Sequence, residues 1–378
     1  MGNSLQELHG SAGQSIWVDY LGRDLLGSGE LKRLIEEDSI SGVTSNPSIF
    51  RKAISGSALY DDMFRARLDQ GVVDERELFF SLAIEDVGAA ADLLLPVYEK
   101  SGGTDGYVSI EVSPDLAHET DATIEEARRI FRELGRKNIL IKVPGTSAGI
   151  PAIEQLISEG VNVNVTLLFS TVRYEEIAWA FVQGLERRAQ AGEPVDHIFS
   201  VASFFISRVD TLVDRLLSEK IEAEGDSQEE LKAMLGQAAV ANAKVAWLKY
   251  KPIFEGDRFA SLAVKGASPQ RLLWASTSTK NPDYSDIKYV EELIAPATIN
   301  TLPAETIAAF ADHGNPRVSI DEGLDEAAAL FDRLAAAGVD IEQAAKQLED
   351  EGVKAFSDDF FALLEEITRK REALLAGA

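Results

Sequence analysis

Lys142 is the residue whose type and setting point most directly to chemistry. It is the only charge within residues 139–143, an otherwise apolar run that predicts a strand buried on both faces. A buried amine tends to lose its proton because desolvation disfavours the charged form, and a neutral amine can form a Schiff base with a carbonyl compound. The alternatives are a lysine that extends to solvent or a lysine paired with a carboxylate.

Polar residues also interrupt the apolar pattern of residues 161–167. Asn162, Asn164 and Thr166 alternate there with valine and leucine, so the three polar side chains should share one face of a strand. A parallel strand covered by helices is normally apolar on both faces, so a polar face indicates a ligand inside a barrel. The alternative is an antiparallel strand with one face in water.

Three more polar residues stand near the ends of other predicted strands, where barrel enzymes build their sites. They are Asp19, Asn46 and Glu111. Singly, each has a structural explanation as a helix cap, a turn residue or an ion-pair partner. Together with Lys142 they provide an amine, two carboxylates and an amide, which are groups that carbonyl chemistry requires.

Two basic segments suit a phosphate group. Arg208 follows a predicted strand at the start of a helix, although it could instead pair with nearby Asp210. Arg271 and Lys280 flank a hydroxyl-rich run near the seventh predicted strand, and loops after strands seven and eight commonly bind phosphate in barrel enzymes. Ordinary loop capping would also explain those hydroxyls.

The elements that must position these residues alternate between short apolar runs and longer helical patterns. This rhythm predicts parallel strands with crossover helices, and eight such strands predict a closed barrel. The predicted strands are residues 16–21, 42–46, 107–112, 139–143, 161–168, 197–205, 271–276 and 298–302.

Amphipathic patterns predict helices between the strands, including residues 74–100, 123–134 and 174–188. Residues 210–250 should form two helices separated near Glu224-Gly225-Asp226. Strand signals stop after about residue 316. We therefore predict an α/β fold, a (β/α)8 TIM barrel in which residues 1–378 form a single domain and residues 321–378 form a helical extension packed on the barrel.

Composition narrows the possible partners and cofactors. The net charge of -26, with no basic stripe, argues against nucleic acid or an anionic membrane surface as a partner. The chain has no cysteine and its four histidines are scattered, so we expect no metal site, and residues 145–149 match no nucleotide-binding fingerprint. A polar N-terminal segment and the lack of an apolar stretch of ~20 residues lead us to expect a cytoplasmic protein, either a monomer or a homodimer.

In their order and placement on strands, these motifs resemble the transaldolases, a family of Schiff-base-forming class I aldolases built on a (β/α)8 barrel. The run at 274–282 and the long C-terminal helices resemble the larger bacterial subgroup. The matching segments are residues 17–19, 44–48, 108–112, 139–144, 162–170 and 203–208.

The resemblance implies a role for each candidate residue. Lys142 would form the Schiff base, Asp19 would exchange the proton of the sugar's C4 hydroxyl, and Glu111 would handle protons through a water that Thr166 helps to hold. The substrate-binding residues would be Asn46, Asn164 and Ser203 for hydroxyls, Arg208 for phosphate, Arg271 or alternatively Lys280 for a second phosphate contact, and Phe205 for the pocket wall. Phe204, Ile206 and Ser207 depart from the commoner Ser-Pro-Phe-Val-Gly-Arg form of this motif.

The implied activity is that of a transferase in the non-oxidative pentose phosphate pathway. A dihydroxyacetone unit would move from sedoheptulose 7-phosphate or fructose 6-phosphate to glyceraldehyde 3-phosphate or erythrose 4-phosphate, without a metal or organic cofactor. One alternative is a fructose 6-phosphate aldolase, which releases dihydroxyacetone, but Glu111 and Phe205 favour the transferase. Another is a non-catalytic sugar-phosphate-binding barrel, which would have little use for Lys142 and Glu111 together.

Overall fold

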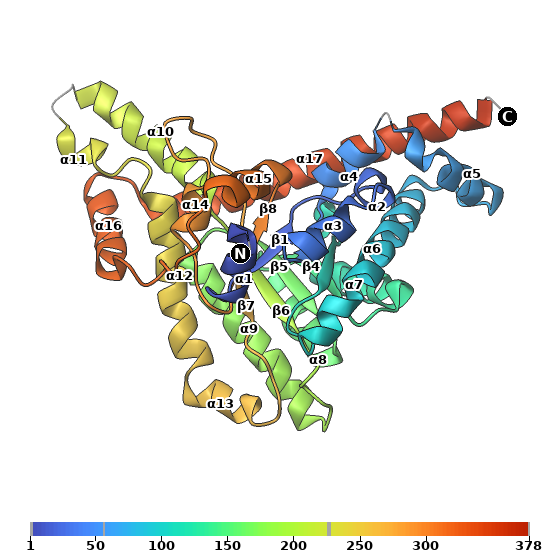
Figure 1. Ribbon diagram of the computed structural model, residues 1–378, viewed down its shortest axis with the longest axis horizontal. Coiled ribbons are helices and arrows are strands. Elements are labelled where there is room, and N and C mark those ends of the chain that lie inside the picture. Colours follow the sequence, from blue (N-terminus) through green and yellow to red (C-terminus); the bar gives the residue numbers. More distant parts are fainter. Residues whose placement is uncertain (1–2, 56, 225–227, 377–378) are drawn as a thin grey trace.

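Eight parallel strands close into a barrel in the computed structural model, which describes residues 3–55, 57–224 and 228–376 (Figure 1). Each strand pairs with its neighbours in sequence, and β8 pairs with β1 to complete the ring. The fold class is therefore the one predicted. The strands are β1 (Ser15–Val18), β2 (Ile40–Val43), β3 (Tyr107–Glu111), β4 (Ile139–Pro144), β5 (Val163–Leu168), β6 (Ser200–Phe205), β7 (Arg271–Ala275) and β8 (Ile299–Leu302).

All eight predicted strands are present, but several are shorter than their apolar patterns suggested. β2 ends at Val43 because Asn46 caps the next helix through the Ile49 N–H and Pro47 occupies its first turn. β5 begins after Asn162, whose side chain accepts a hydrogen bond from the Phe199 N–H. Asn162 therefore lies at the N-terminal end of the barrel, away from Thr166 at the other end of the strand.

Helices cover the outside of the barrel, and the predicted helices at 74–100, 123–134 and 174–188 correspond to α6, α7 and α9. The region 210–250 contains α10 and α12 with the short α11 between them; Gly225 and Asp226, at the predicted break, lie outside the described residues. None of the helices in the described ranges is long and apolar enough to cross a membrane. The helices are α1 (Ser4–Gly10), α2 (Arg23–Gly27), α3 (Glu30–Glu37), α4 (Pro47–Ile54), α5 (Asp61–Asp69), α6 (Glu75–Lys100), α7 (Thr120–Leu134), α8 (Gly149–Glu159), α9 (Thr171–Gln190), α10 (Ser207–Glu224), α11 (Glu229–Lys232), α12 (Ala238–Phe254), α13 (Asp257–Ala263), α14 (Lys288–Glu291), α15 (Ala304–His313), α16 (Leu324–Ala336) and α17 (Ile341–Ala376).

The barrel interior combines tight apolar packing with one hydrogen-bonded polar layer. Gly42 lies against the Trp17 ring, where a Cβ atom would approach the ring to 2.4 Å, so only glycine fits. Asn164 donates to Ser109 Oγ at 3.0 Å and accepts from Ser203 Oγ at 2.7 Å. This layer ties β3, β5 and β6 together beneath the C-terminal ends of the strands and satisfies amide groups that would be costly to bury alone.

The last helix, α17, is the main addition to the barrel. Figure 1 shows it as a long red helix that runs along the edge of the barrel, past α4, to the C-terminus. It contacts α4, α6, α10 and β5. The helices expected after residue 321 are present as α16 and α17; the assignment of residues 1–378 to a single domain stays a prediction.

Candidate active site

Lys142 lies inside the barrel near the C-terminal end of β4. Its Nζ donates a hydrogen bond to the Ser45 carbonyl oxygen at 3.0 Å and lies 3.3 Å from Oε2 of Glu111. The two side chains are only 6% and 3% exposed, and they are neighbours because β3 and β4 pair with Glu111 opposite Lys142. The lysine therefore does not extend to solvent; it is paired with a carboxylate, and the pair lies at a position suited to catalysis.

Glu111 and Thr166 are buried without satisfying all of their polar atoms. Within the described residues, neither Glu111 oxygen nor Thr166 Oγ1 has a hydrogen-bond partner. Burial raises the pKa of Glu111, and nearby Lys142 offsets part of that rise. A cavity of about 10 Å³ adjoins Glu111, which is close to the space that one water molecule needs.

Asp19 follows β1 and lies in the same mouth of the barrel. Thr44 donates a hydrogen bond to Asp19 Oδ1 at 2.8 Å, and Thr44 Oγ1 is 2.7 Å from Thr301 Oγ1. Burial raises the pKa of Asp19, while Thr44 and Lys142 oppose the rise and Glu305 adds to it. A carboxyl group with a raised pKa can both accept and return a proton near neutral pH.

A cavity of about 350 Å³ joins these groups at the C-terminal ends of the strands. Its cationic lining residues are Lys52, Lys142, Arg208 and Lys280. Its lining also includes five residues that we singled out as candidates from the sequence besides Lys142 and Arg208: Asp19, Asn46, Thr166, Ser203 and Phe205.

Arg208 begins α10 beside this cavity with its guanidinium free of hydrogen bonds to the described residues. Burial lowers its pKa, and the charges of Asp359 and Glu351 on α17 work in the opposite direction. The expected alternative, a pair with Asp210, is not formed, since Asp210 instead accepts from the Ala239 N–H and the Tyr289 hydroxyl. Arg208 therefore has donors available for an anion in the cavity.

The three residues predicted to bind substrate hydroxyls differ in whether their side chains are accessible from the cavity. Asn46 lines it, although its Oδ1 is already used as the helix cap that accepts from Ile49. Ser203 also lines it. Asn164 is fully buried and its oxygen and nitrogen are both engaged, so it lies behind Ser203 rather than in the wall.

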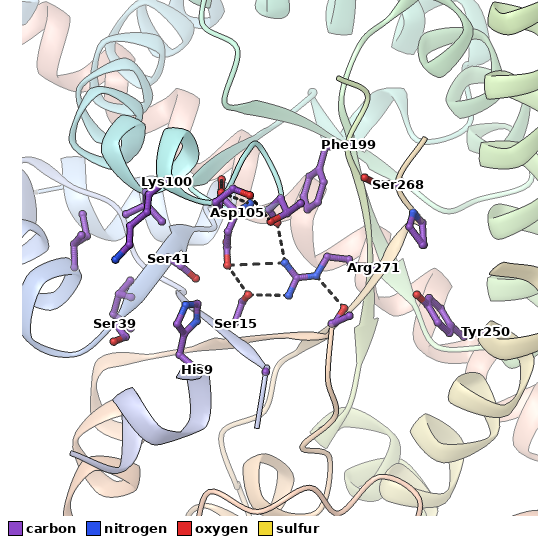
Figure 2. A pocket seen from close by; sticks show the side chains of 18 residues that line it. His9, Ser15, Ser39, Ser41, Lys100, Asp105, Phe199, Tyr250, Ser268 and Arg271 are labelled. Carbon is purple, nitrogen blue, oxygen red and sulfur yellow. Dashed lines mark hydrogen bonds and ion pairs between the residues drawn. The ribbon is translucent and has the colours of Figure 1, made fainter. Parts of the chain in front are cut away.

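Arg271 is not part of this site, which corrects our expectation from the sequence. It is the first residue of β7, whereas Ala275 at the other end of that strand lines the cavity, about 13 Å away at ~3.3 Å per residue. Figure 2 shows Arg271 in a separate pocket at the N-terminal end of the barrel, where it reaches Ser15 and lies near Asp105. Its guanidinium also donates to the carbonyl oxygens of Thr104, Ala297 and Thr298. Lys280, the alternative phosphate ligand, does line the active cavity, where it is exposed and donates to Ser278 at 2.6 Å.

Some residues of the site were not singled out from the sequence. Thr44 donates to Asp19, and the Thr301 hydroxyl is hydrogen-bonded to that of Thr44. Thr44 could have been found from its place in the strand-end segment 44–48. Phe356 and Asp359 of α17 line the cavity. The apolar stripe of a long amphipathic helix indicates which face is buried, but not which part of the barrel that face meets. In the ranges that the structure covers, no three acidic, imidazole or thiol side chains are grouped to hold a metal ion.

Comparison with known proteins agrees with this geometry. The family model described as transaldolase/fructose-6-phosphate aldolase matches residues 16–367. The chain is 46% identical over 379 residues to a transaldolase of Trichodesmium erythraeum (strain IMS101), with 98% of each chain covered. It is 48% identical over 368 residues to transaldolase 2 of Nostoc sp. (strain PCC 7120 / SAG 25.82 / UTEX 2576), with 96% of each covered. It is 47% identical over 358 residues to a transaldolase of Mycobacterium tuberculosis (strain CDC 1551 / Oshkosh), with 94% of each covered. The chain therefore belongs to the transaldolase/fructose-6-phosphate aldolase family.

Proposed function

We propose that this chain is a transaldolase that transfers a dihydroxyacetone unit between sugar phosphates through a Schiff base on Lys142. The donors are sedoheptulose 7-phosphate or fructose 6-phosphate, and the acceptors are glyceraldehyde 3-phosphate or erythrose 4-phosphate. The observation that carries the proposal is the Lys142 amine, which is buried 3.3 Å from Glu111 and opens onto a cavity that also holds Asp19.

Imine formation is the first step. The neutral Lys142 amine attacks C2 of the ketose, and the carbonyl oxygen takes a proton to give a carbinolamine. Loss of the C2 oxygen as water then forms the iminium ion. Glu111 supplies and recovers protons through a water, for which the small cavity beside it has room. The Thr166 hydroxyl, unpartnered among the described residues, lines the larger cavity together with Lys142, where it is available to a water on the amine side.

Cleavage of the C3–C4 bond follows. Asp19 takes the proton of the C4 hydroxyl, an aldehyde forms at C4, and the bonding electrons move through C3 and C2 to the iminium nitrogen. The aldose phosphate leaves and an enamine stays on Lys142. C3 of the enamine then bonds to the aldehyde carbon of the acceptor, Asp19 returns the proton to the new hydroxyl, and hydrolysis of the resulting iminium releases the new ketose.

Substrate contacts follow from the lining of the cavity. Arg208 binds the phosphate through its free guanidinium, and Lys280 takes the place that we first gave to Arg271. Asn46 and Ser203 contact the hydroxyls of the three-carbon unit, while Asn164 orients Ser203 through their 2.7 Å hydrogen bond. Phe205 forms part of the wall next to Arg208, whose guanidinium carbon lies 5.4 Å from the ring centre.

The same proposal covers partners and location. Sugar phosphates are the partners, and the acidic chain is unsuited to nucleic acid or to an anionic membrane surface. A chain without cysteine is compatible with a reducing cytoplasm, where we place the protein as a monomer or homodimer.

Borohydride trapping tests the covalent step. Incubation with fructose 6-phosphate and sodium borohydride should add a reduced dihydroxyacetone group to Lys142, and peptide mass spectrometry would locate it. The absence of an adduct, or an adduct on Lys280 or Lys52 instead, would refute the assignment.

A product assay separates transfer from simple cleavage. With fructose 6-phosphate and erythrose 4-phosphate together, the main product should be sedoheptulose 7-phosphate. If fructose 6-phosphate turns over equally fast without the acceptor and yields dihydroxyacetone, the chain is an aldolase rather than a transferase.

A further inference from the structure

Phe356 of α17 lies over the reactive amine. The centre of its ring is 5.8 Å from Lys142 Nζ, the residue is 5% exposed, and it lines the same cavity as Lys142 and Asp19. The roles assigned so far, to residues of the barrel itself, do not use this ring. The C-terminal helix therefore contributes an apolar wall to the site.

A glycine allows α17 to approach the barrel closely enough for this contact. A Cβ atom at Gly352 would lie 3.0 Å from Leu167 Cδ2, so the helix and the Leu167 side chain are in close contact there. Glycine inside a helix costs about 0.5–1 kcal/mol relative to alanine, and this close approach gives a reason for it. Phe356 follows four residues later on the same face and is carried towards the mouth of the barrel.

Ion pairs fix α17 to the barrel on both sides of Phe356. Before it, Glu349 pairs with Arg173 of α9 at 3.6 Å. After it, Asp359 pairs with Arg51 of α4 at 3.0 Å. Phe356 is therefore held in place in the middle of an anchored helix.

One turn further along, Phe360 closes the second compartment of the site. It lines the small cavity that adjoins Glu111, and its ring packs 5.6 Å from that of Phe79. The Phe356 and Phe360 rings, on one face of α17, thus border the two cavities from which water can reach the Lys142 amine and the Glu111 carboxylate.

We propose that Phe356 is a specificity-determining residue that screens the Lys142 enamine from water and thereby favours transfer over hydrolysis. This rests on the proposed transaldolase function. Enamine C3 is separated from Nζ only by C2, so a ring over the amine also covers C3. An apolar cover limits the delivery of protons to C3 and leaves the acceptor aldehyde as its main reaction partner.

The two fates of the enamine differ in what bonds to C3. In hydrolysis, C3 takes a proton and the nitrogen becomes an iminium; water adds to C2, the C2–N bond breaks, and dihydroxyacetone leaves as the amine is restored. In transfer, C3 bonds instead to the aldehyde carbon, whose oxygen takes the proton from Asp19. The ratio of dihydroxyacetone to sedoheptulose 7-phosphate therefore measures how the enamine divides between protonation at C3 and addition to the acceptor aldehyde.

The test measures this ratio for wild type, Phe356→Leu and Phe356→Ala with fructose 6-phosphate and erythrose 4-phosphate, while a coupled enzyme removes glyceraldehyde 3-phosphate. The ratio should increase in that order as the apolar cover shrinks, with a rise of roughly tenfold for alanine. Because both products come from the same enamine, the ratio does not depend on the fraction of folded protein. If Phe356→Ala does not fold, the product ratio of Phe356→Leu alone tests the proposal.

Phe361→Ala is the matched control, because Phe361 is a phenylalanine on the same helix, five residues after Phe356, and is 46% exposed. Its ratio should equal that of the wild type. An unchanged ratio in both Phe356 variants, or an equal rise in the control, would overturn the role of Phe356. Failure of the wild type to form the borohydride adduct would instead show that the proposed function has failed.

Discussion

The two ends of the barrel hold similar polar side chains in opposite conditions. At the N-terminal end, the buried Arg271 makes four hydrogen bonds and lies near Asp105, which itself accepts from Ser15 and Trp17 (Figure 2). At the C-terminal end, Glu111 and Thr166 have no hydrogen-bond partner among the described residues. The Arg271–Asp105 network is thus hydrogen-bonded throughout the first end, although Gln14 and Gln270 each keep one side-chain oxygen there that is unpartnered within the described part of the chain. The groups without partners at the second end are instead those that we assign to proton transfer.

This contrast shows that satisfaction of polar groups is a better guide to function than the size of a pocket. The cavity at the N-terminal end is the larger of the two, about 630 Å³ against about 350 Å³. Its arginine, Arg271, donates to backbone carbonyls. Its lysine, Lys100, is the last residue of α6, where a positive charge interacts favourably with the negative end of the helix dipole. Unsatisfied buried groups lower stability, so their retention at the other end is consistent with catalysis.

The largest effect should come from Lys142→Met, which removes the nucleophile. Transfer activity should fall on the order of 10⁵-fold, as expected when a covalent catalyst loses its reacting group. Steady-state assays with fructose 6-phosphate and erythrose 4-phosphate would measure the loss. Circular dichroism should show a folded barrel, and substantial residual activity that still gives a borohydride adduct would place the nucleophile elsewhere.

Arg271→Met should destabilise the protein without changing its chemistry. The substitution leaves the carbonyls of Ala297, Thr298 and Thr104 without their donor, together with a buried Asp105, and should lower the free energy of unfolding by roughly 3–5 kcal/mol. Urea unfolding measures this loss. Turnover per folded molecule should be unchanged.

Lys280→Met is the counterpart of Arg271→Met, because it removes a positive charge at the C-terminal end of the barrel. Because Lys280 is exposed, its loss should leave the unfolding free energy within about 0.5 kcal/mol of wild type. The KM for fructose 6-phosphate should rise instead. Two results would contradict the assignment of Arg271 to stability and Lys280 to substrate binding. One is a raised KM in Arg271→Met, and the other is a loss of stability in Lys280→Met as large as that in Arg271→Met.

Glu111→Gln should slow turnover by about 10²–10⁴-fold, and its effect on stability should depend on pH. Burial raises the pKa of Glu111 in the folded state, so its contribution to stability is complete below the unfolded pKa and is lost as the pH rises through the folded pKa. Glutamine is neutral at every pH. The stability of the variant relative to wild type should therefore be higher at about pH 8 than at about pH 5, measured by urea unfolding at both.

Asp105→Asn gives the comparison at the other end of the barrel. Asp105 accepts hydrogen bonds from Ser15 and Trp17, so its loss should lower stability near neutral pH. An unchanged or increased stability of Asp105→Asn would contradict the view that this network holds the N-terminal end together.

The sequence was sufficient to predict the fold and to select most of the candidate residues that the structure brings together at one end of the barrel, because both depend on local patterns. Lys142, Glu111 and Asp19 lie in or directly after apolar strands, and the period of two in a strand decides which side chains face the interior. The misplacement of Arg271 was avoidable. It opens the predicted strand 271–276, so in a parallel barrel it had to lie at the N-terminal end.

Other features of the site depend on packing that no local pattern reveals. The Lys142 amine donates to the backbone carbonyl of Ser45, an acceptor that every residue type provides. Phe356 reaches the amine because α17 packs against the barrel, in close contact with Leu167 at Gly352. Neither contact follows from periodicity, because each joins segments that are distant in the chain.

Thr166→Val is the smallest change that tests the difference in hydrogen bonding between the two ends of the barrel. The hydroxyl has no partner in the described residues, so replacing it by a methyl group of similar shape should raise the unfolding free energy by roughly 1 kcal/mol, while turnover falls because the catalytic water loses a contact. Thr44→Val is the control, since the Thr44 hydroxyl donates to Asp19 and its loss should destabilise. If Thr166→Val also destabilises, an ordered water already satisfies the hydroxyl in the resting enzyme, and the two ends of the barrel differ in their ligands rather than in their strain.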